Sequence, residues 1–97
     1  MTEGRAQAVG TLLVETDRVK VWRYEFAPGA ETGWHRHGHD YVICAVTDCA
    51  MRLELPGGEV SEVLVPAGSA YARTEGVEHN VINAGIVPMC FIETELK

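Results

Sequence analysis

A strict alternation of apolar and polar residues constrains the fold more than any other feature of this sequence. Residues 22–26 (WRYEF) alternate in this way, and residues 51–55 (MRLEL) repeat the pattern. A period of two residues is typical of a β-strand with one buried face. The alternating segments are short because glycine and proline turn signals interrupt them at residues 27–29, 56–58, 66–68, 75–76 and 84–85.

These turns divide the chain into eight predicted strands, near residues 9–16, 19–27, 39–47, 50–56, 59–65, 69–74, 77–83 and 87–96. An all-β chain of this length must bury one face of its sheet and protect the sheet edges. We therefore predict one domain over residues 1–97, built as a jelly roll or β-barrel.

Composition narrows the classes of partner. The net charge is −6, and the eight Lys and Arg residues are scattered, so we expect neither nucleic acid nor an anionic membrane as a partner. No apolar run approaches the roughly 18 residues of a membrane helix, and residues 1–5 do not resemble a signal peptide, which favours the cytoplasm. Three cysteines without CxxC spacing indicate reduced thiols rather than disulfides or a cysteine-based zinc site.

All four histidines lie in two short segments, residues 35–41 (HRHGHDY) and 79–83 (HNVIN). On an extended backbone, residues i and i+2 project from the same face, so His35 and His37 can aim both imidazoles at one point. His79, from another strand, is the natural third ligand. The sequence thus predicts a site for a divalent transition metal, with iron, manganese, nickel, copper and zinc all compatible with imidazole ligands.

The spacing of these residues resembles the two cupin motifs. Gly29, five residues, His35, one residue and His37 resemble the opening of motif one, G(X)5HXH(X)3,4E(X)6G, which we place at residues 29–48. The metal-binding Glu of that motif falls on Tyr41, and its last Gly falls near residue 48. Residues 66–68 (PAG), followed by the HxxxN of residues 79–83, resemble motif two at about residues 58–83, with an insertion before the histidine. The resemblance implies an RmlC-like jelly-roll barrel.

A narrower resemblance extends over residues 34–42, 76–85 and 93–97. These segments are similar to small bacterial cupins that include a protein associated with β-alanine degradation, a group in which Tyr also commonly replaces the motif Glu. The resemblance implies a dioxygenase-like or isomerase/lyase-like reaction on a small carboxylic or amino acid. The alternatives are a binding module in which the metal only anchors a small molecule, and a metal-free barrel.

Further residues beside the motifs are candidates for the site. His39 shares the parity of His35 and His37 and is a candidate extra ligand. Tyr41 is the candidate catalytic residue, as a proton or hydrogen-bond donor, with metal ligation or plain packing as alternatives. Asn83 can hydrogen-bond inside the barrel. Three residues are candidates for the pocket or its rim: Trp34, Tyr71 and Arg73. The aromatic stripe in residues 22–26 is expected to be core.

Two apolar segments suggest that part of the surface is covered. Residues 10–16 read as an exposed strand, and residues 87–92 as an apolar patch. The resemblance to small cupins, in which two copies of the chain commonly pair through such strands, implies a homodimer, and we predict one here.

Overall fold

The computed structural model describes residues 4–97, which form nine β-strands and one 3-10 turn. The strands are β1 (Val9–Glu15), β2 (Val19–Phe26), β3 (His35–Arg36), β4 (Asp40–Ala45), β5 (Cys49–Glu54), β6 (Val60–Val65), β7 (Ala70–Arg73), β8 (Glu78–Asn83) and β9 (Met89–Leu96), and the turn η1 is Pro56–Gly58. Each of the eight predicted strands overlaps an observed one. The additional strand, β3, was not predicted because its two residues are too few to show a period.

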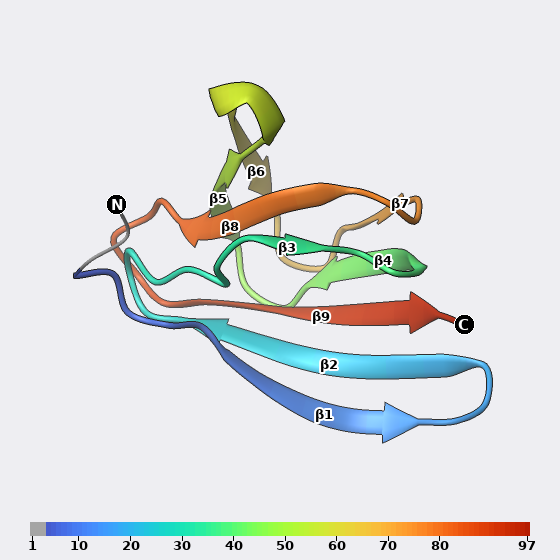
Figure 1. Ribbon diagram of the computed structural model, residues 1–97. Coiled ribbons are helices and arrows are strands. Elements are labelled where there is room, and N and C mark those ends of the chain that lie inside the picture. The colour runs from blue at the N-terminus through green and yellow to red at the C-terminus, as the bar shows by residue number, and fades with distance from the viewer. Residues whose placement is uncertain (1–3) are drawn as a thin grey trace.

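The strands form two antiparallel sheets that face each other across the core (Figure 1). One sheet has the order β1-β2-β9-β4-β7 and the other the order β3-β8-β5-β6. This all-β jelly roll confirms the predicted fold class. Within residues 4–97, no helix has the length and apolar character needed to cross a membrane.

The alternation in the sequence becomes the two faces of the five-stranded sheet. Strand β9 lies between β2 and β4, and its register places Phe91 opposite Tyr24 and Ala45. Residues directly opposite each other point to the same face, so every second residue of β9 faces the other sheet. The core between the sheets contains the apolar members of these rows, among them Phe26, Met51, Met89 and Phe91.

This arrangement corrects one expectation. Residues 87–92 do not form an exposed apolar patch. Met89 and Phe91 are buried in the core, and Val87 is exposed. Strand β1, in contrast, is an edge strand with β2 as its neighbour, and it exposes Leu12, Leu13 and Val14.

Candidate metal centre

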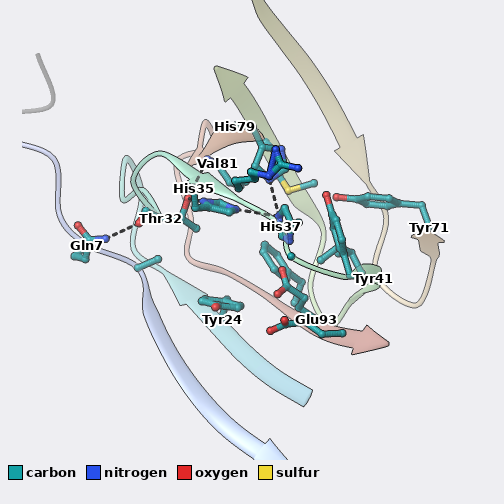
Figure 2. A pocket seen from close by; sticks show the side chains of 17 residues that line it. Gln7, Tyr24, Thr32, His35, His37, Tyr41, Tyr71, His79, Val81 and Glu93 are labelled. Atoms are coloured by element: carbon teal, nitrogen blue, oxygen red, sulfur yellow. Dashed lines mark hydrogen bonds between the residues drawn. The ribbon is translucent and has the colours of Figure 1, made fainter. Parts of the chain in front are cut away.

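Three histidine side chains meet between the sheets, as predicted. His35 of β3 lies directly opposite His79 of β8, and His37 follows β3 with its backbone still paired to the neighbouring segment through Val77. The Nε2 atom of His37 lies 3.0 Å from that of His35 and 3.1 Å from that of His79 (Figure 2). The three ligand atoms lie within 4.8 Å of one another, so this group can hold a metal ion.

The hydrogen bonds of His35 determine which of its nitrogens faces the cluster as an acceptor. Its Nδ1 lies 2.9 Å from the carbonyl oxygen of Gly33, which can only accept, so Nδ1 carries the hydrogen. In this tautomer of the imidazole, the Nε2 lone pair lies on the side of the other two rings. The Gly33 peptide is itself held, because its N–H donates to Oδ1 of Asn80 at 2.9 Å. A ligand histidine anchored through its other nitrogen is typical of metal sites.

Burial keeps the other two rings neutral. Desolvation lowers the pKa of His37 to about 4, with further contributions from His35 and His79, and it lowers the pKa of His79 to about 4, with a further contribution from His35. Neutral imidazole is the form that binds metals. Without an ion, the Nε2 atoms of His37 and its two neighbours are at hydrogen-bond distance, and a cation between the three rings could instead be bound by all three Nε2 lone pairs.

The spacing of the nitrogens also fits a transition metal. Two nitrogen ligands about 2.1 Å from an ion are about 3.0 Å apart at a right angle and about 3.4 Å apart at the tetrahedral angle. The separations of 3.0 and 3.1 Å between Nε2 of His37 and those of His35 and His79 are close to the first of these values. Three protein ligands would leave coordination positions for a substrate.

The histidines form part of the wall of a cavity of about 360 Å³. The other residues around it are mostly aromatic or polar and come from both sheets (Figure 2); they include Gln7, Tyr24, Thr32, Tyr41, Tyr71, Phe91 and Glu93. This volume lies at the lower end of the range for ligand pockets, so the cavity suits a small metabolite.

Comparisons with known proteins agree with this geometry. Residues 22–95 match the family described as "Cupin domain". The chain belongs to the cupin family. It is 55% identical, over 94 residues, to the "Beta-alanine degradation protein BauB" of Pseudomonas aeruginosa, an alignment that covers 97% of this chain and 98% of that protein.

Solved structures show the same cupin fold. A cupin domain from Bordetella pertussis superposes with a TM-score of 0.91 at 44% identity, covering 96% of each chain. A protein with a double-stranded β-helix domain from Klebsiella pneumoniae superposes with a TM-score of 0.77 at 21% identity, covering 97% of this chain and 78% of that one. At that identity the likeness concerns the fold alone.

Tyr41, which replaces the glutamate of cupin motif one, lies against the metal centre. Its ring is stacked on that of His37, with centroids 3.7 Å apart and the planes inclined by 15°, and it is only 2% exposed. Burial, with smaller contributions from Tyr71 and Glu93, raises the pKa of the phenol above its ordinary value. Tyr41 therefore presents a neutral hydroxyl group at physiological pH.

The remaining predicted site residues separate into two groups. Tyr71 lines the cavity, and Arg73 lies over its ring at 4.6 Å. The other three lie elsewhere. His39 is half-buried and is not a member of the histidine group, and Trp34 is 55% exposed beside a separate shallow depression. Asn83 is buried, as predicted, but its amide holds a loop, donating to the carbonyls of Phe26, Ala27 and Val87 and accepting from the N–H of Gly85.

Sequence reasoning missed the carboxyl groups of this cupin's cavity. Glu93 and Glu95 of β9 both line it, and Trp22 donates to Oε1 of Glu95 at 2.9 Å. The signal was present in the alternation, since residues 89, 91, 93 and 95 share one face of β9 and the first two are core. Tyr24 packs against the core, as expected, and it also lines the cavity.

Proposed function

We propose that this cupin is a small metalloenzyme in which His35, His37 and His79 hold one divalent transition-metal ion. The substrate is a small carboxylic or amino acid, and the reaction is dioxygenase-like or isomerase/lyase-like. One observation carries the proposal: three imidazoles converge, with their ligand atoms within 4.8 Å of one another, at the wall of a cavity. Buried polar groups without a purpose are unfavourable, and this cluster has no packing role that apolar residues would not fill better.

The protein's residues determine what the centre can do. When bound, the ion would supply Lewis acidity toward a carboxylate or carbonyl oxygen, and a redox-active ion such as iron would add one-electron chemistry with dioxygen. Three neutral ligands leave its positive charge uncompensated, which favours an anionic substrate. Tyr41, the proposed catalytic residue, offers its neutral hydroxyl as a hydrogen-bond or proton donor beside His37.

The size of the cavity and the relatives support the substrate class. A cavity of about 360 Å³ admits a metabolite of a few heavy atoms. A relative 55% identical to this chain is named for β-alanine degradation, which concerns a small amino acid. Arg36 also lines the cavity, where its guanidinium group can attract a carboxylate.

A non-catalytic binding role is the second candidate. It is favoured by the burial of Tyr41, because a stacked phenol with a raised pKa packs well and releases its proton reluctantly. In that case the metal and the cavity capture a metabolite without transforming it. Turnover of a bound amino or carboxylic acid by the metal-loaded protein, followed by mass spectrometry, separates the two roles.

The metal site is tested by elemental mass spectrometry on untagged protein purified without chelator. We expect about one metal ion per chain in the wild type and none in the His35→Ala/His37→Ala/His79→Ala variant, with the fold of both checked by circular dichroism. His39→Ala is the matched control, because His39 is a histidine of the same segment that lies outside the cluster, and it should retain the metal. A wild type that binds no metal after anaerobic reconstitution with each divalent ion would end the enzyme proposal.

We also propose that the chain forms a homodimer in the cytoplasm, where its three free cysteines would stay reduced. The exposed apolar residues of edge strand β1, Leu12, Leu13 and Val14, support pairing through this strand. Size-exclusion chromatography with light scattering should give twice the mass of the chain, and Leu13→Lys should shift it toward the monomer. A wild-type monomer at micromolar concentration contradicts the dimer.

A further inference from the structure

Glu93 occupies an unusual position in the five-stranded sheet. It lies at the middle of β9, directly opposite Trp22 of β2 and Ile43 of β4. It therefore points between the sheets, in line with Met89 and Phe91 of the core. The residue is only 8% exposed, and it lines the same cavity as the three histidines.

Within residues 4–97, no side chain or backbone group hydrogen-bonds or forms an ion pair with the Glu93 carboxylate. The groups whose charges interact with it are Tyr24 of β2, Tyr41 of β4, Tyr71 of β7 and Glu95 of its own strand. The three histidines and Arg36 line the same cavity, and Arg73 lies over the ring of Tyr71, but the ion pair of Arg36 is with Glu78 and neither arginine pairs with Glu93. Burial, and then the charge of Glu95, raises the pKa of Glu93 to about 7. An ionised carboxylate held this way destabilises the fold unless a cation or hydrogen-bond donor reaches it through the cavity.

The cavity thus has two chemically different sides. The histidines come from the four-stranded sheet and the segment after β3, whereas Glu93, Glu95 and Tyr24 come from the sheet opposite (Figure 2). Glu93 is not a member of the group of ligand atoms that can hold the metal. A loaded metal centre attracts an anionic group, while a buried carboxylate beside an aromatic ring attracts a cation.

We propose that Glu93, with Glu95 and the ring of Tyr24 beside it, is a subsite for the ammonium group of a small amino acid whose carboxylate faces the three histidines. This inference rests on the proposed function in one respect only: the proposed metal centre binds the carboxylate of the ligand. An ammonium group supplies the hydrogen-bond donors that Glu93 lacks within the described protein. The subsite narrows the substrate class from carboxylic acids in general to amino acids, because an acid without the amine leaves a buried carboxylate unpaired.

The test compares probes that differ only in the amine. Zn²⁺-loaded protein, with zinc as a redox-inactive ion, is titrated calorimetrically at pH 8 with β-alanine, 4-aminobutanoate, propionate and butanoate. The amines of the first two are protonated at this pH. We expect at least one amino acid to bind about tenfold or more tightly than the acid of the same chain length, the usual consequence of pairing a buried charge.

The variant Glu93→Gln keeps the shape of the side chain and removes its charge. It should reduce the ratio of the two affinities to near one while the zinc content stays at the wild-type level. Glu62→Gln, which alters an exposed carboxylate on β6, should keep the wild-type ratio. An equal affinity of wild-type protein for the amino acid and its amine-free analogue, absence of binding of all four probes, or an unchanged ratio in Glu93→Gln would overturn the subsite.

The same titrations separate this inference from the proposed function. Protein that takes up no metal but still prefers the amino acids, and loses that preference in Glu93→Gln, would refute the metal centre and support the subsite. Protein that takes up metal but shows no preference would refute the subsite and leave the metal centre intact.

Discussion

Replacing Glu93 by glutamine should stabilise the metal-free protein at neutral and alkaline pH and leave its stability in acid unchanged. In the folded protein, burial and the nearby Glu95 raise the pKa of this carboxyl from 4.5 to about 7. Below pH 4.5 the carboxyl is protonated in both the folded and the unfolded chain, so it does not affect the free energy of unfolding. Above pH 4.5 the unfolded chain ionises first, and the folded state becomes progressively less favourable.

The size of the effect follows from the difference between the two pKa values. Each pH unit between them corresponds to about 1.4 kcal/mol, so the penalty reaches about 3 kcal/mol by pH 7 to 8 and then levels off. Glu93 is buried, so solvent screening reduces this figure little. For a protein of this size, about 3 kcal/mol is a large fraction of the total stability.

Urea denaturation measures the effect directly, with wild type and Glu93→Gln compared from pH 4 to pH 9 in the presence of a chelator. The titration of the histidines occurs in both proteins and cancels in the difference. Glu62→Gln, on an exposed strand position, should differ from wild type by less than about 0.5 kcal/mol throughout. A difference for Glu93→Gln that stays flat between pH 4.5 and 8, or a variant less stable than wild type at pH 8, would refute the reasoning.

Three further substitutions test other parts of the site. Asn83→Ala removes a buried amide that binds three carbonyls and the N–H of residue 85, so it should destabilise the fold by about 2–4 kcal/mol in urea denaturation. Asn80→Ala frees the Gly33 peptide that anchors His35, so metal affinity measured by competition with a chelator should fall about 10- to 100-fold; because the Asn80 amide also donates to Glu31 and Glu54, the fold should lose stability as well, and circular dichroism checks that the protein measured is folded. Gly10→Ala places a methyl group 2.8 Å from Cε1 of Tyr24, so the ring must shift, and binding of the amino-acid probes should weaken while metal content is unchanged.

The convergence of the histidines could be predicted because it depends on local geometry. Extended backbone places residues i and i+2 on one face, and His37 retains that geometry beyond the end of β3 through hydrogen bonds with Val77 and Gly76. The same rule failed for His39, because the chain turns at Gly38 before β4 begins at residue 40. The spacing of two residues predicts which side chains share a face only as long as the backbone stays extended.

Other features depend on contacts between distant segments, which one sequence does not reveal. Asn80 contributes through Gly33, 47 residues away, and Asn83 through carbonyls on a different loop. Trp34 adjoins His35 in sequence, yet it lies at the surface, because it stands in the bend before β3 begins. Adjacency in sequence was therefore a poor guide to the cavity, and alternation along β9, which carries Glu93 inward, was the better one.

The pairing of strand β9 fixes the Glu93 side chain in the cavity. The strand is paired on both sides, with β2 and with β4, and its inward residues Met89 and Phe91 are core. A slip of one residue would turn Glu93 outward, but it would also expose Met89 and Phe91, which is a far larger loss than the burial of one carboxylate. The fold fixes the position, whereas nothing in the fold requires an acid there, since the neighbouring Ile43 shows that an apolar residue packs well in this row. A glutamate at such a position is best explained by a cationic ligand, and this links the stability measurement to the binding measurement: the charge that destabilises the empty protein is the one that should select the amino acid.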